Sequence, residues 1–443
     1  MDLEALRTAI ESGEVETVVL AFTDMQGRLQ GKRIMGRHFL DEIVGNGAEG
    51  CNYLLAVDVE MNTVSGFAMA SWDTGYGDFV MRPDFSTLRP MPWEVGTVLC
   101  LADLVWADGS DVVASPRQIL RRQLARLAER GWTAHASTEL EFLMFLDSYE
   151  EAACKHFRDL QPANAYNVDY SLLGTSRVEP LIRRIRNSMM QAGLEVETSK
   201  GECNYGQHEI TFRFAQALSA ADNHSVYKNG AKEIAAQEGR AISFMAKYNE
   251  REGNSCHIHF SLTDEQGMLF ARDRAVFDAF LAGQLAHARE LTMMIAPNVN
   301  SYKRFAVGSF APTTVAWGRD NRTCAYRVVG HGVGLRFENR AGGADLNPYL
   351  ALAAVIAAGL DGVDRGLALE PVFEGNAYAA SDAHPRLPAT LHEARELFAG
   401  SQLARDAFGD AVVDHYLNAA DVELRAFEAT VTDWERVRGF ERL

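Results

Sequence analysis

The order of hydrophobic and polar residues separates an N-terminal part without long helices from a C-terminal part in which helices and strands alternate. The pattern over residues 16–36 predicts a hairpin, with strands at 18–22 and 29–34 joined by a turn. The stretch 62–92 is rich in Gly, Pro, Asp and Trp and lacks a long helical pattern. These patterns predict a small α+β domain over residues 1–105.

Two helices are clearly predicted in the second part of the chain. Ser115-Pro116 places a capping residue before a proline at the first helical position, and apolar residues follow at helical spacing up to Gly131. Asn347-Pro348 begins another helix, whose Ala- and Leu-rich sequence extends to about residue 364. We therefore predict a second, larger domain over residues 106–443.

Composition and charge narrow the range of partners. The 443 residues carry a formal net charge of -17, which argues against a general nucleic-acid binder. There is no apolar run of about 18 residues, and the acidic start Met1-Asp2-Leu3-Glu4 does not resemble a signal peptide. The six cysteines are scattered without a CxxC pair, which indicates free thiols. We expect a cytoplasmic protein with no membrane or nucleic-acid partner.

Acidic residues recur where strands would place them together. A strand predicted from Thr133 carries Glu139 and Glu141 on one face. Burying two carboxylates there is costly unless cations neutralise them, and a solvated strand face is the simpler alternative. Farther along, a glycine- and asparagine-containing turn between two extended segments allows Glu202 and Glu209 to reach the same side.

Two further segments add imidazole and guanidinium groups. His257 and His259 share a strand face beside a glycine-containing loop, where a lone histidine would more often be a satisfied core residue. Arg336, Glu338 and Arg340 alternate onto one face of another strand. Further arginines lie upstream, at Arg304, Arg319, Arg322 and Arg327. Guanidinium groups match phosphate and carboxylate oxygens, so an anionic ligand is expected, with surface ion pairs as the alternative.

The combined set of side chains suits a metal-dependent enzyme. Carboxylates with at least one imidazole favour Mg²⁺ or Mn²⁺. The sequence contains neither a Walker A loop nor a GxGxxG turn, so metals and arginines would have to hold the phosphates of any nucleotide. These residues predict metal-assisted phosphoryl transfer or hydrolysis.

The ordered motifs resemble those of the glutamine synthetase superfamily, and most closely its γ-glutamyl-amine ligases. In chain order they are Glu139-Leu140-Glu141, Glu202 with Gly206-Gln207-His208-Glu209, His257-Ile258-His259, Asn321-Arg322 with Arg327, Arg336-Phe337-Glu338-Asn339-Arg340, and Asn347-Pro348-Tyr349-Leu350. The resemblance implies a β-grasp-like N-terminal domain and a C-terminal domain with a curved antiparallel sheet flanked by helices. It also implies a homo-oligomer, usually a dodecamer of two stacked hexameric rings, with each site at a subunit boundary.

The resemblance also implies a role for each motif residue. Two or more Mg²⁺ or Mn²⁺ ions are expected, one near glutamate and one at the ATP phosphates. The expected ligands are Glu141, Glu202 and Glu209 for the glutamate-side ion, and Glu139, His257 and Glu338 for the nucleotide-side ion. Residues expected at the nucleotide are His259, Ser261, Arg322, Arg327 and Arg336. Residues expected to hold glutamate are Gly253, Arg304 and Arg340. The expected catalytic groups are His259, Arg322 and Arg340.

One position departs from glutamine synthetases that use ammonia. Phe310 stands where those enzymes carry a glutamate that helps take a proton from ammonium, and the DGSS segment that helps bind ammonium is missing. The expected third substrate, besides glutamate and ATP, is therefore an organic amine such as ethanolamine, or a polyamine. Carboxylates suggested for its charged end are Asp58, Glu60, Asp73 and Asp78.

The predicted activity is ATP-dependent ligation of the γ-carboxylate of L-glutamate to an amine through a γ-glutamyl phosphate. Three alternatives are a glutamine synthetase that uses ammonia, a non-catalytic nitrogen-sensing homologue, and a related metal-dependent hydrolase. Phe310 argues against the first alternative, and the complete set of expected metal ligands argues against the second. Turnover without ATP would identify the third.

Overall fold

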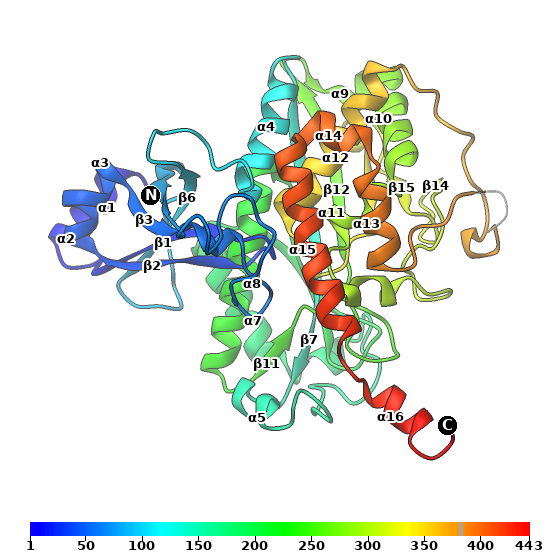
Figure 1. Ribbon diagram of the computed structural model, residues 1–443, viewed down its shortest axis with the longest axis horizontal. Coiled ribbons are helices and arrows are strands. Elements are labelled where there is room, and N and C mark those ends of the chain that lie inside the picture. Colours follow the sequence, from blue (N-terminus) through cyan, green and yellow to red (C-terminus); the bar gives the residue numbers. More distant parts are fainter. Residues whose placement is uncertain (381–383) are drawn as a thin grey trace.

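The computed structural model describes residues 1–380 and 384–443 and has an α+β fold with two sheets, as predicted (Figure 1). The strands of the first sheet lie between residues 17 and 105, and those of the second between residues 133 and 339. The domain boundary proposed at residue 105 falls between these two sets of strands and stays a prediction. Among the described residues, no helix combines the length and the apolar character needed to cross a membrane.

The first sheet has six strands in the order β2-β1-β6-β4-β3, with β5 paired to β6. They are Thr17–Thr23 (β1), Leu29–Met35 (β2), Ala48–Cys51 (β3), Asp78–Pro83 (β4), Arg89–Pro90 (β5) and Thr97–Val105 (β6). β1 and β2 form the predicted hairpin, in which a Cβ at Gly31 would lie 2.0 Å from the Leu20 carbonyl oxygen. Because β1 also pairs in parallel with β6, this sheet is mixed. Its β-grasp-like character stays a prediction.

The second sheet has ten strands and carries the site motifs. Its order is β14-β15-β16-β12-β7-β9-β8, with β10 and β11 paired to β7 and β13 paired to β12. Among its described strands, only β14 and β15 pair in parallel, so the sheet is largely antiparallel as expected. Its strands are Thr133–Phe145 (β7), Val196–Gly201 (β8), Gln207–Phe212 (β9), Ala215–Gln216 (β10), Ala241–Ser243 (β11), Cys256–Asp264 (β12), Gly267–Met268 (β13), Trp317–Arg319 (β14), Tyr326–Val329 (β15) and Arg336–Asn339 (β16).

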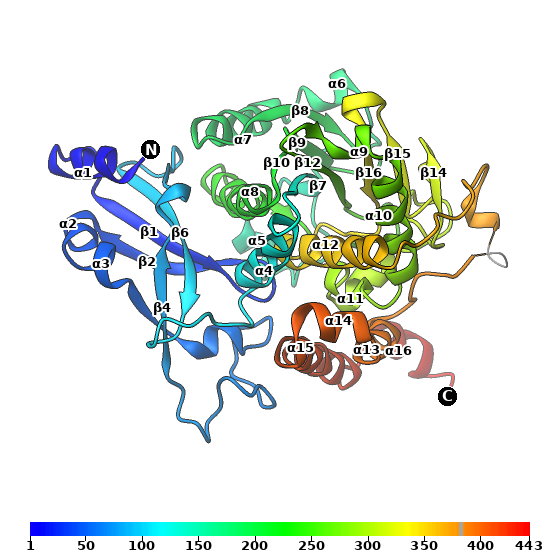
Figure 2. The same cartoon turned by 90° about the horizontal axis from the view of Figure 1, so that it is seen from above.

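Helices α4, α8, α10 and α12 lie beside the second sheet, and the C-terminal helices pack outside them (Figure 2). The described helices are Leu3–Glu11 (α1), Gly36–His38 (α2), Val44–Asn46 (α3), Pro116–Ala128 (α4), Tyr149–Cys154 (α5), Leu172–Thr175 (α6), Glu179–Gln191 (α7), Ala217–Gln237 (α8), Leu269–Arg272 (α9), Arg274–His287 (α10), Thr292–Ile295 (α11), Pro348–Asp364 (α12), Leu391–Ala399 (α13), Gln402–Phe408 (α14), Asp410–Glu428 (α15) and Asp433–Gly439 (α16).

Both predicted helices are present, as α4 and α12. Ser115 occupies the N-cap position of α4 without a side-chain capping bond, and Gly131 follows the helix with a φ of +72°. α12 is almost completely buried and packs against α4, α8 and α10. The apolar face of β12 points toward these helices, since Phe260 stacks on Phe280 of α10 with ring centroids 5.3 Å apart. The polar face of β12 therefore points away from them.

Candidate active site

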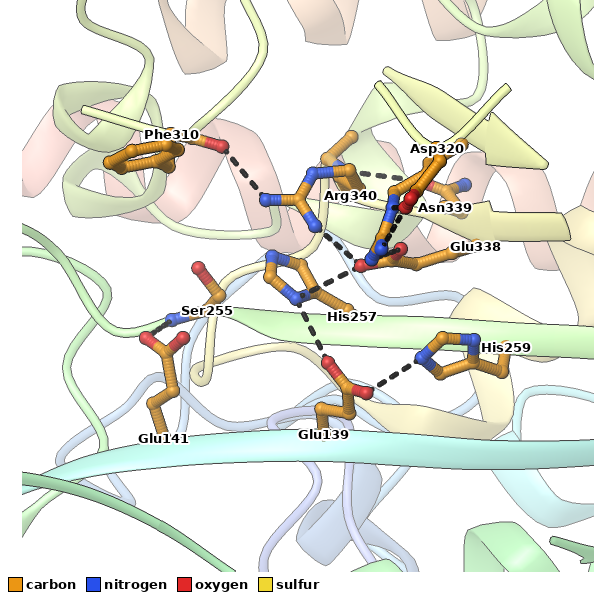
Figure 3. Close-up of polar contacts among 12 residues, drawn as sticks. Glu139, Glu141, Ser255, His257, His259, Phe310, Asp320, Glu338, Asn339 and Arg340 are labelled. Carbon is orange, nitrogen blue, oxygen red and sulfur yellow. Dashed lines mark hydrogen bonds and ion pairs between the residues drawn. The ribbon is translucent and has the colours of Figure 1, made fainter. Parts of the chain in front are cut away.

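The motif segments lie on neighbouring strands of the second sheet, and the strand register brings their polar side chains together (Figure 3). β12 pairs with β7 so that His257 lies opposite Glu139, and β16 brings Glu338 to the other side of β12. On the far side of β7, Glu141 lies opposite Glu209 of β9. Because alternate residues of a strand point to one face, these side chains share one side of the sheet.

Glu139, His257 and Glu338 form one group of candidate metal ligands, here called the Glu/His cluster. Their potential ligand atoms lie within 4.8 Å of one another. His257 Nδ1 is 3.3 Å from Glu139 Oε2 and 3.3 Å from Glu338 Oε1. Burial and the charge of Arg340 lower the pKa of His257 to about 4. Its imidazole is therefore neutral near pH 7, and in that form one of its two ring nitrogens carries a lone pair.

The two carboxylates of the Glu/His cluster are kept ionised by their neighbours. Burial alone would raise the pKa of Glu139, but hydrogen bonds from the two histidines of β12 outweigh it and lower the pKa. Glu338 is fully buried and contacts Arg327 at 2.9 Å and Arg340 at 2.5 Å. Against the effect of burial, His257 and Arg340 lower the pKa of Glu338. This cluster therefore presents negative charge without needing a further cation to ionise it.

Glu141, Glu202 and Glu209 form a second group, here called the triglutamate cluster, and its charge is poorly balanced. Their potential ligand atoms also lie within 4.8 Å of one another. Lys200 forms an ion pair with Glu202. Burial and the charge of Glu202 raise the pKa of Glu141 to about 8, and burial with the neighbouring carboxylates raises the pKa of Glu209 well above its ordinary value. A bound divalent cation would remove this repulsion.

The arginines divide into paired and free groups. Arg327 and Arg340 neutralise Glu338, whereas Arg322 is exposed and forms no side-chain ion pair with the described residues. Arg336 Nε donates to His259 Nδ1 over 3.2 Å. Because a guanidinium only donates, Nδ1 of His259 accepts, and its Nε2 carries the proton toward Glu139 Oε1, 2.8 Å away. The hydrogen-bond network thus fixes the tautomer of His259.

Two adjoining cavities lie over these residues. The larger has a volume of about 750 Å³, and its lining includes His259, Ser261 and Arg336. The smaller has a volume of about 300 Å³, and its lining includes both clusters, Gly253 and Arg322. Side chains that line both cavities are Glu139, Tyr170, Lys200 and Glu209. A large and a small ligand bound in these cavities would therefore meet at the candidate metal-binding carboxylates.

Phe310 and Arg304 take different positions relative to the smaller cavity. Phe310 lines it, with a φ of +58° and with its carbonyl oxygen accepting from Arg340 Nη2 over 3.3 Å. Arg304 is 1% exposed, lines neither cavity, and donates to the carbonyl oxygens of Arg340 and Ala341 at 2.7 and 2.8 Å. These bonds support the backbone beside Arg340. A direct contact of Arg304 with glutamate stays a prediction.

Lys200, Tyr170 and Glu252 also line the smaller cavity, and the sequence analysis missed them. Lys200 lies opposite Glu209 in the β8–β9 pair, and its ammonium group is 4.7 Å from the ring centroid of Tyr170. A basic residue two positions before Glu202 was its only signal. Glu252 precedes Gly253 and belongs to no motif. The carboxylates suggested earlier for the amine lie elsewhere, because neither cavity is lined by Asp58, Glu60, Asp73 or Asp78 of this chain.

Candidate metal ligands and arginines thus share one face of a largely antiparallel sheet, and the chain belongs to the glutamine synthetase family. The model of the glutamine synthetase catalytic domain matches residues 113–438. The γ-glutamylethanolamide synthetase GlnA4 of Streptomyces coelicolor is 62% identical over 447 aligned residues, which cover 100% of this chain and 96% of the relative. A glutamate–isopropylamine ligase of a Pseudomonas species is 36% identical, over 98% of this chain and 96% of the relative.

Solved structures agree with this family membership. The structure described as GmaS in complex with ADP has a TM-score of 0.87 and 26% sequence identity, and it covers 98% of this chain and 99% of its own. The structure of apo GmaS without ligand has a TM-score of 0.86 with the same identity and coverage. The predicted glutamine synthetase fold is therefore confirmed.

Proposed function

We propose that this protein joins the γ-carboxylate of L-glutamate to an organic amine and converts ATP to ADP and phosphate. The observation that carries the proposal is that Phe310, an aromatic side chain, lines the same cavity as the triglutamate cluster. Two relatives that align with almost the whole chain are named for the amides of organic amines, ethanolamine and isopropylamine. Ethanolamine is therefore the first amine to test.

The donor atoms of both clusters fit divalent cations that prefer oxygen ligands. We assign the triglutamate cluster to an ion beside glutamate and the Glu/His cluster to an ion at the ATP phosphates. The carboxylates suit Mg²⁺, and the imidazole of His257 also suits Mn²⁺. When bound, such ions neutralise the charge of the phosphoryl group during its transfer.

The side chains around the clusters bind and orient the reactants in this proposal. Arg322, Arg327 and Arg336 bind phosphate oxygens, which match the geometry of the guanidinium group. Gly253 and Arg340 hold glutamate so that its γ-carboxylate attacks the γ-phosphorus of ATP, and ADP leaves. The product is γ-glutamyl phosphate. This activation is needed because a carboxylate would have to expel oxide, whereas an acyl phosphate expels phosphate.

The second half of the reaction depends on the amine. Its nitrogen attacks the γ-carbonyl carbon, the bond from this carbon to the phosphate oxygen breaks, and the amide forms. Phe310 offers an apolar surface at this cavity, so a methylene group buried there contributes about 0.8 kcal/mol. Ammonia has no carbon substituent and gains nothing from this contact. The proposed pocket therefore favours an organic amine through its carbon chain.

Assembly and location complete the proposal. We assign the protein to a homo-dodecamer of two stacked hexameric rings in the cytoplasm, on the basis of family membership alone. Light scattering coupled to size-exclusion chromatography tests this assembly. A monomer of 48.9 kDa in solution would contradict it.

An amine panel tests the proposed reaction. Phosphate release is measured with glutamate and ATP in the presence of ammonia, methylamine, ethanolamine, isopropylamine or putrescine, and the amide is identified by mass spectrometry. We expect kcat/KM for the best organic amine to exceed that for ammonia by at least about tenfold. Ammonia as the best substrate would identify a glutamine synthetase, and phosphate release without amide formation would identify a hydrolytic enzyme.

A further inference from the structure

The smaller cavity contains more carboxylates than its two metal clusters use. Five of its acidic residues belong to the Glu/His and triglutamate clusters, and the two others are Asp169 and Glu252. Asp169 forms a further possible metal-binding group with Glu202 and Cys203. Asp169 already contacts Lys200 at 3.5 Å and accepts a hydrogen bond from the Cys203 thiol. The half-buried Glu252 side chain forms no ion pair and no hydrogen bond with the residues that the structure describes. Its carboxylate is available to a ligand.

The side-chain amides of two buried residues hold the backbone at Glu252 in place. Asn204 is fully buried, and its Nδ2 donates to the Glu252 carbonyl oxygen over 2.7 Å and to Asn249 Oδ1 over 2.9 Å. Gln207 Nε2 donates to the Gly253 carbonyl oxygen over 2.9 Å. At Gly253 a Cβ would lie 2.3 Å from the Ala246 carbonyl oxygen, so the loop is closely packed there. The Glu252 side chain is thus held on a rigid support.

The same amide ties this loop to the triglutamate cluster. Gln207 Nε2 also donates to Glu141 Oε2 over 3.0 Å, so one side chain contacts both the cluster and the residue after Glu252. Phe310 also lines this cavity and offers an apolar surface there. The cavity therefore combines a free carboxylate and an aromatic ring near the proposed glutamate site. An alkylammonium ion needs both features, a counter-charge for its nitrogen and an apolar surface for its carbon chain.

From the juxtaposition of the free Glu252 carboxylate and Phe310 in one cavity, we infer that Glu252 binds the ammonium group of the amine substrate and accepts its proton before attack. This inference rests on the proposed amine ligase function. An alkylamine reaches the site as R–NH₃⁺, which has no lone pair. Transfer of one proton to the Glu252 carboxylate gives R–NH₂, whose lone pair forms the new C–N bond while the C–O bond to phosphate breaks. The second nitrogen proton leaves with the phosphate. Glu252 would thus act as the proton-accepting carboxylate, a role for which Phe310 has no suitable group.

The Glu252→Gln variant tests this role with two nucleophiles. Ethanolamine is mostly protonated at pH 7, whereas hydroxylamine is already uncharged and needs no proton acceptor before attack. We expect kcat/KM for ethanolamine to fall about 100-fold or more, which is the usual contribution of a positioned base. Activity with hydroxylamine and the KM for glutamate should stay within about twofold of wild type. The ethanolamine rate of the variant should also recover as pH rises, because free amine then becomes available.

Charged groups near Glu252 must be accounted for in the pH profile. They are Lys247 on the same loop, and Glu250 and Arg251 next to it in the chain. The charge of Glu252 opposes the lowering by burial of the pKa of Lys247, and it adds to the raising by burial of the pKa of the Cys203 thiol. Glu250→Gln is the matched control, because Glu250 is exposed, lies on the same loop and lines neither cavity. This control should keep wild-type rates with both nucleophiles and a wild-type pH profile.

Each other outcome overturns the inference. Equal losses with ethanolamine and hydroxylamine would show general damage to the site, and a rise only in the KM for glutamate would place Glu252 at the α-ammonium group of glutamate. An amine-specific loss in Asp169→Asn but not in Glu252→Gln would assign the role to Asp169. Failure of the proposed function is distinguished by the wild-type protein, which would then form no amide with any organic amine. Thermal unfolding of each variant shows whether it is folded.

Discussion

Arg117 and Lys200 both lie among buried carboxylates, but only the carboxylates around Arg117 have enough positive charge to balance them. Arg117 contacts Asp84, Asp103 and Asp222 at 2.8, 2.6 and 2.9 Å, and Arg121 lies 3.4 Å from Asp103. Here these residues are called the Arg117 network. It joins Asp84, which directly follows β4, to β6, α4 and α8, and therefore connects the first sheet to the helices beside the second.

The pKa values show the consequence of this difference. In the Arg117 network, Ser86 and Arg117 lower the pKa of Asp84 although burial opposes them. In the triglutamate cluster, burial and Glu202 raise the pKa of Glu141 to about 8. A buried network that contains its own counter-charges serves the fold, whereas one that lacks them gains stability from a cation in solution. The second case is a candidate cation site, for a physical reason that requires no motif.

Removing the guanidinium of Arg117 should have the largest effect on stability. Arg117→Met leaves three carboxylates without their main partner in an environment where the arginine side chain was only 3% exposed. We expect the free energy of unfolding to fall by about 3–5 kcal/mol. Urea denaturation monitored by circular dichroism measures this change.

Arg121→Met is the matched control, because its side chain is 43% exposed and its contacts are longer. We expect a loss below about 1 kcal/mol for this variant. If Arg117→Met is no less stable than Arg121→Met, the Arg117 network is not a structural clamp and the comparison fails.

Neutralising one carboxylate of the triglutamate cluster should have the opposite effect on stability and a strong effect on activity. In Glu209→Gln, an amide replaces a proposed metal ligand and one source of repulsion disappears. We expect activity to fall about 100-fold or more, equivalent to about 2.7 kcal/mol. Without divalent cations, the variant should be at least as stable as wild type. Steady-state kinetics over a Mn²⁺ series and urea denaturation with chelator measure the two quantities.

Glu195→Gln is the control for this variant, since its side chain is 66% exposed at the end of the same sheet region. It should change neither activity nor stability by more than about 0.5 kcal/mol. A Glu209→Gln protein that keeps wild-type activity at limiting Mn²⁺ would remove Glu209 from the proposed ligand set.

Some features of the fold and of the candidate site follow from local sequence patterns, and others do not. Alternation along single strands placed Glu139 with Glu141 and His257 with His259, and a proline start predicted α12 at Pro348. These features depend on local periodicity and capping, which neighbouring residues determine. The pairing of His257 with Glu139 depends on strand register across 118 residues of sequence, which local patterns do not contain.

Residues outside the motifs were harder to predict because their roles come from distant contacts. Asn204 and Gln207 bind the backbone around Glu252, and these residues lie more than 40 positions earlier in the chain. Arg304 was expected to hold glutamate. Its guanidinium donates to two backbone carbonyl groups, and a direct contact with glutamate stays a prediction. A single sequence identifies side chains that are suited to ligands, whereas the packing determines which of them are already paired.

The smallest effect, and the sharpest test of charge balance, is the pH dependence of cation binding. A cation that enters the triglutamate cluster must displace protons from Glu141 and its neighbours, because their pKa values are raised in the metal-free protein. Affinity should therefore rise by about tenfold per pH unit, or about 1.4 kcal/mol, for each proton released, until pH exceeds about 8 for Glu141. Calorimetric titration with Mn²⁺ in two buffers of different ionisation enthalpy counts these protons.

The Glu/His cluster provides an internal control for this titration. Its carboxylates have lowered pKa values, and the pKa of His257 is about 4. Cation binding there should therefore release no proton between about pH 6.5 and about pH 8.5. Stability of the metal-free protein should show the complementary sign. A carboxyl group with a raised pKa favours the folded state below its unfolded pKa, and this contribution disappears as pH rises through the folded pKa. Equal proton release at both sites would contradict the assignment of balanced and unbalanced clusters.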